Sequence, residues 1–554
     1  MERPLFLLLK SLVVIFVIYK LGCFARNYYH ARRSGLPVHV VPVFTKSALW
    51  LVLAPMLQPQ LEKYLPSLIY DQIDVAIHGW EFRRKRLYHD RLGAIFAVVT
   101  PDEFTVWCAD PAIGTTILQN RNEFQQAPIV SSVLGFLGSN VFMTNGDEWK
   151  RHRRMFNKNL DERISRVVWT ETLQQAQAMI NYLVEHPGNE TLDGLRSIAI
   201  NVIGKAGYNW QQPWSPNELD IPPKSATGKE AYFGMLGLVT TMIMEAALLP
   251  RKVMQLPFMP PALQSMGYHL ERAPRYIQEI LKNERESDSS KKHSESNFLS
   301  LMLQFSEEEN SDYETNSSPS LTQEEISGNL FVFTSAGFET TANTMGFAVI
   351  LLALYPEWQD WIQNEIHSLD ISGSNWTYEN TFPKCKRTLA LMFETLRLYT
   401  PVGHTTRAIF NPTSLSGTDG QTYSLTPPLD IYVEQSIIHL DSAIWGDDAM
   451  DFRPSRWIDE SGDLITPDKG TFLPWSGGPR VCPGVRFSQV EFVATMATLF
   501  RNSRCAPLTV PGDRPEDPAI RLKMAIANTV TKLTLSVKDP KEVQLDWTAC
   551  GEAV

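Results

Sequence analysis

The sequence has few cysteines, and no cysteine forms a motif with another. Six are spread over the 554 residues, at positions 23, 108, 385, 482, 505 and 550, without a C-x-x-C pair. Neither a disulfide framework nor a zinc site is therefore indicated, and a reducing compartment is favoured. A glycine-rich nucleotide-binding loop is also absent. The thiol of Cys482 should therefore be free.

An excess of basic residues is missing as well. The formal net charge is −10 at pH 7, which argues against general nucleic-acid binding, because a protein that binds nucleic acid needs a basic surface to neutralise phosphates. The composition is 44% hydrophobic and 20% charged, enough for a large buried core. Length alone allows about two to four domains and does not decide the number.

Long hydrophobic runs are rare, but one opens the chain. Residues 4–25 are apolar apart from Lys10, Ser11 and Lys20, and a basic segment that contains Arg26, Arg32 and Arg33 follows. This pattern predicts a transmembrane anchor over residues 1–26 with the rest of the chain in the cytosol, and Lys10 would have to snorkel to an interface. A cleaved signal peptide is the alternative, although no small-residue cleavage site precedes the basic segment.

A second apolar run, residues 48–57 (ALWLVLAPML), is too short to span a bilayer and contains a proline. It is either part of the core or a helix that lies in the membrane interface, and the interface is favoured. We therefore expect residues 27–60 to form a linker with an interfacial helix, and residues 61–554 to form one catalytic domain.

The most informative stretch is residues 472–484, FLPWSGGPRVCPG, which runs into the apolar residues 485–500. Cys482 would lie at a helix N-terminus, where the helix dipole and free N–H groups lower a thiol pKa, and a thiolate is a good axial ligand for iron. Gly478 and Gly484 would let the backbone approach a flat cofactor, and Arg480 could meet a carboxylate on it. The alternative is a buried structural cysteine after a glycine-rich turn.

The loop resembles the ligand loop of the cytochrome P-450 family, the haem-thiolate monooxygenases, which reads F-x-x-G-x-R-x-C-x-G. Trp475 stands where the family usually has phenylalanine, so an aromatic cover near the sulfur is kept. The resemblance implies that Cys482 binds the iron of haem b, and that Trp475, Arg480 and Gly484 contact this cofactor.

A basic segment, GDEWKRHRRMF at residues 146–156, holds Trp149 and Arg153 four residues apart and so on one helix face. A solvated basic helix is the ordinary explanation. The family carries a W-x-x-x-R pair here, and the resemblance implies that Trp149 and Arg153 both donate to a haem propionate. The resemblance further implies that the other basic residues of this segment lie where an acidic electron donor docks in the family. These residues are Lys150, Arg151, Arg154 and Lys158.

A capping box, TQEE at residues 322–325, predicts a helix that runs to about Tyr355, before Pro356. The centre of this helix reads AGFETT. A glycine inside a helix costs about 1 kcal/mol relative to alanine, which either close helix packing or a local widening for dioxygen would offset. The family pattern [AG]-G-x-[DE]-T matches, and the resemblance implies that Glu339 and Thr340 organise protons for catalysis.

E-x-x-R motifs occur at Glu394 and Arg397 and, among other places, at Glu81 and Arg84. The resemblance implies that the first pair forms a buried structural network with Arg456. It also implies that Arg407 contacts a propionate. Substrate-facing segments are expected at residues 402–406, in parts of 121–140 and around 525–530.

These motifs imply a mainly α-helical fold with small β sheets, in which haem lies between the helix of Thr340 and that of Cys482. Residues 94–99 and 104–108 predict a β hairpin. The implied activity is insertion of one oxygen atom from O2 into a lipophilic small molecule. Electrons would come from a separate NADPH-dependent flavoprotein reductase at the endoplasmic reticulum membrane.

The family's wider pattern is similar to that of fungal oxygenases of secondary metabolism. Two other functions stay open at this point. One is a haem-thiolate enzyme that performs isomerisation, dehydration or oxidative coupling, and the other is a haem-binding sensor without turnover. The acid and alcohol at 339 and 340 favour dioxygen activation.

Overall fold

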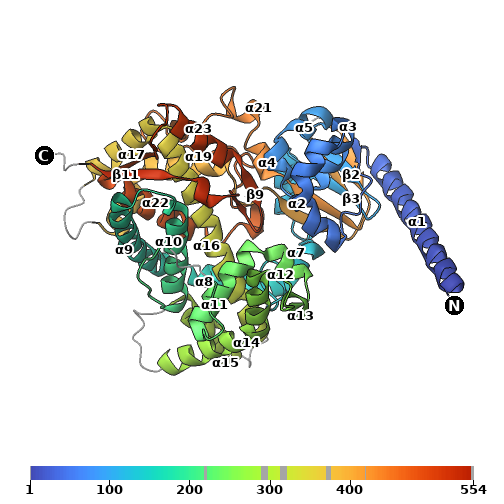
Figure 1. Cartoon of the computed structure of the whole chain (residues 1–554), viewed down its shortest axis with the longest axis horizontal. Helices are drawn as coiled ribbons and strands as arrows, with labels where there is room; N and C mark the ends of the chain where they lie inside the picture. The colour runs from blue at the N-terminus through green and yellow to red at the C-terminus, as the bar shows by residue number, and fades with distance from the viewer. Residues whose placement is uncertain are drawn as a thin grey trace. The chain divides into compact units, whose positions relative to one another are not determined.

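A computed structural model describes residues 2–216, 221–288, 297–311, 321–369, 376–417 and 420–550 (Figure 1). The chain forms two compact units. The first, here called the sheet unit, comprises residues Met1–Pro128, Val402–Met450 and Pro467–Val481. The second, the helical unit, comprises Ile129–Pro401, Asp451–Thr466 and Cys482–Val554. The described residues are mainly helical with small sheets, as the sequence predicts.

The sheet unit contains a five-stranded sheet in the order β1-β2-β3-β7-β4. Its strands are β1 (Val38–Val40), β2 (Ile95–Val99), β3 (Phe104–Cys108), β7 (Leu429–Val433) and β4 (Thr405–Ile409). β2 and β3 pair antiparallel, with Ile95 opposite Cys108, so the predicted hairpin is confirmed. β3 pairs parallel to β7, and β7 pairs antiparallel to β4, with Arg407 opposite Ile431.

The other elements of this unit are short helices and a two-stranded ribbon. They are α3 (Ser67–Ile73), α4 (Trp80–Arg84), α5 (Leu87–Leu92), α6 (Pro111–Gln119), α20 (Gln435–Ile438) and α21 (Ser442–Trp445), with β5 (Thr413–Ser416) paired to β6 (Thr422–Leu425).

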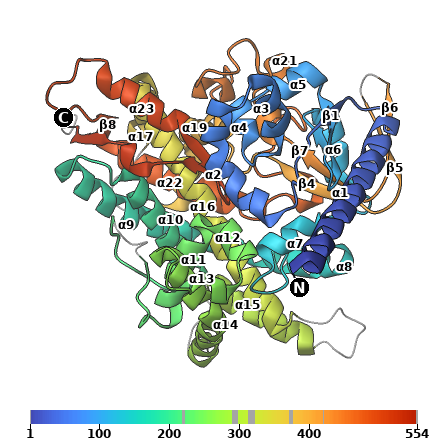
Figure 2. The same cartoon turned by 45° about the vertical axis from the view of Figure 1, so that its right-hand side comes forward.

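Helix α1 (Glu2–Arg33) projects from the sheet unit, and its N-terminal end points away from it (Figure 1). Its C-terminal part is attached to the unit by several contacts. Lys20 forms an ion pair with Asp102, the side-chain amide of Asn27 donates to the carbonyl of Thr100 at 3.1 Å, and Ala31 is fully buried in the core. Figure 2 shows α1 crossing in front of this sheet. The apolar residues from Leu12 to Leu21 whose side chains are described are exposed.

Helix α2 (Ala48–Tyr64) has two apolar faces. Ala54 packs into a small core with Tyr70, whereas Leu49 and Met56 are 70% and 66% exposed. One face of α2 is therefore buried in the core and the other is an exposed apolar surface, and its place in a membrane interface stays a prediction.

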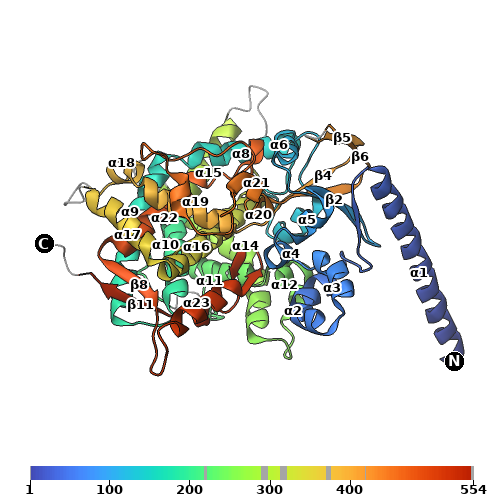
Figure 3. The same cartoon turned by 90° about the horizontal axis from the view of Figure 1, so that it is seen from above.

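The helical unit is built around α16 (Gln323–Leu354), which opens with the predicted capping box of Thr322 and Glu325. The helix is apolar on every side and almost wholly buried, as expected for the central helix of a large core. Its neighbours include α10 (Thr191–Tyr208), α11 (Gly228–Thr241), α19 (Lys386–Leu398) and α22 (Val485–Arg501) (Figure 3).

The remaining helices of the unit are α7 (Pro128–Leu134), α8 (Gly146–Asn159), α9 (Glu162–Glu185), α12 (Ile243–Leu248), α13 (Arg251–Met254), α14 (Pro261–Asp288), α15 (Phe298–Ser311), α17 (Pro356–Ser368), α18 (Tyr378–Thr381) and α23 (Asp517–Ala527). Two antiparallel ribbons complete it, β8 (Ser503–Pro507) with β11 (Leu545–Ala549) and β9 (Thr529–Thr531) with β10 (Leu535–Val537).

The attachment of α1 predicts how far the chain can be shortened. Deleting residues 2–19 removes only the projecting half of α1 and should leave the thermal unfolding midpoint within about 1 °C of the full chain. Deleting residues 2–33 also removes the bond of Asn27 and the core contact of Ala31, and should lower the midpoint by at least about 2 °C. Equal midpoints for the two truncations, measured in the same detergent, would contradict the proposed attachment.

Candidate active site

Cys482 precedes the N-terminus of α22, whose cap residue is Gly484. The backbone N–H of Gly484 donates to the Cys482 sulfur at 3.3 Å. Burial raises the pKa of the Cys482 thiol, while the Gly484 N–H and the positive charge of Arg153 lower it, and burial has the larger effect. The sequence predicts a lowered pKa from the helix N-terminus, and the burial of the sulfur reverses that outcome. A metal ion on the sulfur would itself stabilise the thiolate.

Helix α8 carries Trp149, which is 5% exposed, and Arg153 on the face that the spacing predicts. The neighbouring His152 ties α8 to the beginning of α16. Its ring nitrogens lie 2.8 Å from the side-chain nitrogen of Asn329 and 3.3 Å from a carboxylate oxygen of Glu325. Sequence reasoning missed His152, because its partners are more than 170 positions away.

The basic cluster predicted on α8 is smaller than expected. Arg151 forms an ion pair with Glu325 and its side chain is only 12% exposed. Lys150, Arg154 and Lys158 are exposed. A partner that docks on α8 would therefore meet these three side chains, and Arg151 belongs to the packing of α8 on α16.

The centre of α16 places Glu339 and Thr340 in the helical unit as the sequence predicts. Glu339 is 8% exposed, and its carboxylate lies 2.9 Å from the guanidinium of Arg196 on α10. The same arginine donates to the hydroxyl of Thr240 at 3.1 Å. The hydroxyl of Thr340 donates to the carbonyl of Ala336 at 2.9 Å. Arg196 was not identified from the sequence, since no motif marks it.

Gly337 is explained by close packing. A Cβ at this position would lie 2.6 Å from the terminal methyl group of Ile203 on α10, so only glycine fits without a shift. The α16 helix continues without a break through this turn. Of the two explanations that the sequence leaves open, helix packing therefore accounts for the glycine.

The first E-x-x-R motif forms the predicted network. The Glu394 carboxylate accepts hydrogen bonds from Arg397, Arg456 and the indole of Trp457, each at 2.9 Å. It also accepts one from the backbone N–H of Arg453 at 2.9 Å. Glu394 and Arg397 are fully buried. This carboxylate therefore compensates two guanidinium groups and fixes residues 453–457 on α19.

Within the sheet unit, Arg407 lies on β4 and is 3% exposed. It donates to the side-chain carbonyl of Gln126 at 3.3 Å and to the carbonyl of Thr406 at 2.9 Å. It forms no ion pair with any residue that the structure describes, and burial lowers its pKa to about 10. A buried guanidinium in this state is stabilised by an anion.

The part of the cysteine loop in the sheet unit is attached to β4 and α6. The Thr405 hydroxyl donates to that of Ser476 at 3.1 Å, and the rings of Trp475 and Phe472 meet edge to face. Gly478 has φ +66°, and a Cβ there would lie 2.2 Å from the carbonyl oxygen of Leu118. The glycine is thus required by the backbone and by α6. Arg480 ends the short 3-10 turn Gly478–Arg480.

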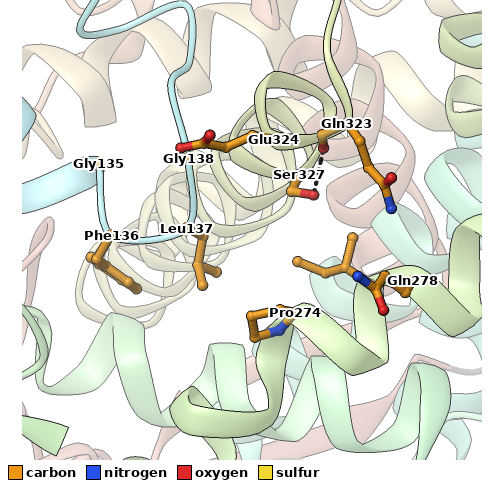
Figure 4. A pocket seen from close by; sticks show the side chains of 10 residues that line it. Gly135, Phe136, Leu137, Gly138, Pro274, Gln278, Gln323, Glu324 and Ser327 are labelled. Atoms are coloured by element: carbon orange, nitrogen blue, oxygen red, sulfur yellow. Dashed lines mark hydrogen bonds between the residues drawn. The ribbon is translucent and has the colours of Figure 1, made fainter.

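A cavity of about 420 Å³ lies in the helical unit (Figure 4). Its walls come from the segment Gly135–Gly138, from Pro274 and Gln278 of α14, and from Gln323 and Ser327 of α16. The segment falls within residues 121–140, part of which is expected to face substrate. None of the predicted haem-contact residues lines this cavity.

Comparisons with known proteins agree with this geometry. The sequence model of the family described as Cytochrome P450 matches residues 75–533. The chain belongs to the cytochrome P450 family.

Fungal members of the P450 family match nearly the whole chain. A phomenoic acid biosynthesis cluster cytochrome P450 monooxygenase of Leptosphaeria maculans is 28% identical over 96% of this chain and 97% of its own. Cytochrome P450 monooxygenase prx9 of Penicillium rubens is 26% identical over 91% and 92% of the two chains. The retinoic-acid-bound cyanobacterial CYP120A1 has the same fold, with a TM-score of 0.64 and 15% identity over 85% of this chain and 95% of its own.

P450 enzymes use a haem-thiolate cofactor, and the residues present fit such a group. In the helical unit, the sulfur of Cys482 accepts a hydrogen bond from the backbone N–H of Gly484, and the positive charge of Arg153 lowers the pKa of the thiol. The sheet unit offers the buried Arg407, which lacks an ion-pair partner among the described residues and suits a propionate. Each unit by itself therefore offers a group of the kind that a haem-thiolate cofactor needs.

The Glu394 network gives a stability prediction. Glu394→Gln leaves two guanidinium groups without their carboxylate, and should lower the free energy of unfolding by about 3–5 kcal/mol. Lys386→Gln is the control, because the Lys386–Asp463 pair is exposed on both sides and its loss should cost less than about 1 kcal/mol. Urea titration followed by fluorescence measures both. Similar midpoints for the two variants would contradict the structural role of Glu394.

Proposed function

We propose that this P450 is a haem b monooxygenase that inserts one oxygen atom from O2 into a lipophilic small molecule, by hydroxylation or epoxidation, in fungal secondary metabolism. The main support is Cys482, whose sulfur accepts an N–H bond at the start of α22 and lies near Arg153. The relative from Leptosphaeria maculans is named for the biosynthesis of phomenoic acid, which supports a secondary-metabolite role.

In this proposal Cys482 ligates the iron, and the aromatic ring of Trp475 and the backbone of Gly484 lie near the sulfur. Four side chains hold the propionates, and they are Trp149, Arg153, Arg407 and Arg480. When bound, the haem supplies activation of dioxygen, which the thiolate assists by donating electron density.

The proposed proton route uses the pair on α16. The Thr340 hydroxyl can release its bond to Ala336 and pass a proton from its oxygen towards the reacting centre. Glu339 would resupply protons. Its carboxylate lies 2.9 Å from the guanidinium of Arg196, whose side chain is one quarter exposed, so the route ends at solvent.

The electrons come from a separate NADPH-dependent flavoprotein reductase in this proposal. An acidic reductase would meet the exposed cations of α8, Lys150, Arg154 and Lys158.

The membrane site is proposed at the endoplasmic reticulum, with the catalytic domain in the cytosol. Residues 1–26 form the anchor, and residues 2–26 belong to α1, whose described apolar side chains from Leu12 to Leu21 are exposed. The exposed apolar face of α2, with Leu49 and Met56, would rest in the interface beside it.

The first test of this function is the iron ligand. Cys482→Ser should abolish the thiolate-type absorbance of the reduced carbon monoxide complex, because an alcohol does not ligate the iron as an anion at neutral pH. Cys505→Ser is the control, since that thiol is buried between α16 and β8 and should leave the spectrum unchanged. An unchanged spectrum for Cys482→Ser would end the proposal.

The second test is the proton route. Thr340→Ala should leave haem binding intact but lower the ratio of product to NADPH consumed by about 10-fold or more, with peroxide formed instead. Thr341→Ala is the matched control, because its hydroxyl makes the same type of bond one residue further, to Gly337. A Thr340→Ala variant that couples NADPH to product as well as wild type would show that this chain uses another proton route. The substrate for this assay comes from product analysis after co-expression with a reductase and candidate metabolites.

A further inference from the structure

In the second E-x-x-R motif, on α4, Glu81 and Arg84 do not pair with each other. Arg84 turns to Asp74, with 3.2 Å between its Nε atom and the carboxylate. Glu81 is 2% exposed, and its Oε1 atom lies 3.1 Å from Nδ1 of His404. Since His404 is the residue before β4, this contact joins α4 to the start of the strand that carries Arg407.

The turn before β4 is held from two sides. A Cβ on Gly403 would lie 2.7 Å from Oε1 of Glu81, so α4 lies directly against the backbone of the turn. On the α20 side, the Ser436 hydroxyl donates to the carbonyl of Gly403 at 3.0 Å. The Gln435 amide donates to the carbonyl of Val402 at 2.8 Å. Little freedom remains for the chain at residues 402–404.

The contact between Glu81 and His404 is an ion pair. Burial disfavours both charges, yet the hydrogen bond and mutual attraction prevail, so the pKa of His404 is raised and that of Glu81 is lowered to about 2. The charge of Glu434 also raises the pKa of His404, and His78 also lowers that of Glu81. Glu434 is itself bound to His89 at 2.5 Å.

Aromatic rings surround the imidazole of His404. The ring centroids of Tyr432 on β7 and Trp107 on β3 lie 4.9 and 5.7 Å from it, both in edge-on geometry. Burial raises the pKa of Tyr432 well above its usual value, so this phenol stays neutral. The ion pair therefore lies in a setting of low polarity, where it is strong and poorly screened.

We propose that the Glu81–His404 ion pair is a positioning element for the cofactor. The ion pair fixes the start of β4. It thereby determines the position of the Arg407 guanidinium and the conformation of residues 402–406, the segment expected to face substrate. This rests on the proposed haem contact of Arg407. The next residue extends the effect, because Thr405 bonds both Gln435 of α20 and Ser476 of the cysteine loop, at 2.9 and 3.1 Å.

The pair should act within a defined pH window. The raised pKa of His404 means that its contribution is complete below its ordinary pKa of 6.5 and is lost as the pH rises through the folded value. The lowered pKa of Glu81 means that its contribution holds above about 4.5 and fades towards pH 2. Haem should accordingly be held most firmly in weakly acidic to neutral solution.

The test is the rate of haem transfer from the full-length holoprotein to excess apomyoglobin. His404→Asn keeps a neutral donor and should raise this rate by about 5- to 10-fold near pH 6.5. His89→Asn is the matched control, because it breaks the other buried imidazole–carboxylate pair of the same unit without touching β4. It should lower the unfolding midpoint but change the transfer rate by less than about 2-fold.

Glu81→Gln keeps the shape of the side chain and removes the charge. In wild type the transfer rate should rise between about pH 6.5 and 9, and in Glu81→Gln that rise should be absent. Equal transfer rates for the two histidine variants, or an unchanged pH profile in Glu81→Gln, would overturn the proposal. Haem transfer is read without substrate, so this outcome does not depend on which reaction the enzyme performs, and the thiolate spectrum of wild type tests the proposed function separately.

Discussion

A single buried carboxylate organises the centre of the helical unit. Glu394 receives two guanidinium groups, one indole and one backbone N–H, all at 2.9 Å. A charge in this place would be costly by itself, but here the carboxylate is paired with cations and every donor has a defined direction. The network joins α19 to residues 451–457, which precede the cysteine loop in the chain.

Local patterns were enough to predict much of this arrangement. The capping box at Thr322 and the β2–β3 hairpin are carried by residues whose types and spacing are informative on their own. The fold class and the buried Glu394 network followed instead from the resemblance of several motifs to those of the P450 family, because an E-x-x-R pair also occurs at Glu81 and Arg84 without such a network. The first two features depend on few residues close in sequence.

The features that the sequence did not predict depend on distant partners. Glu339 meets Arg196, which is 143 positions away, and Glu81 meets His404 at a separation of 323. No local pattern encodes such pairs, since any buried acid can be matched by any cation that the fold brings near. Arg151 was predicted to be an exposed docking residue because it lies in a run of basic residues. Its side chain instead forms an ion pair with Glu325.

The central claim is that Cys482 binds the iron through its sulfur. Burial raises the pKa of this thiol, whereas the N–H of Gly484 and the positive charge of Arg153 favour the thiolate. A metal cation bound to the sulfur would stabilise the buried thiolate further. Resonance Raman spectroscopy of the ferric protein, grown with ³⁴S-labelled cysteine, tests this directly. The account predicts an iron–sulfur stretching band that moves to lower frequency with the heavier isotope. A spectrum without any isotope-sensitive iron–ligand band would contradict it.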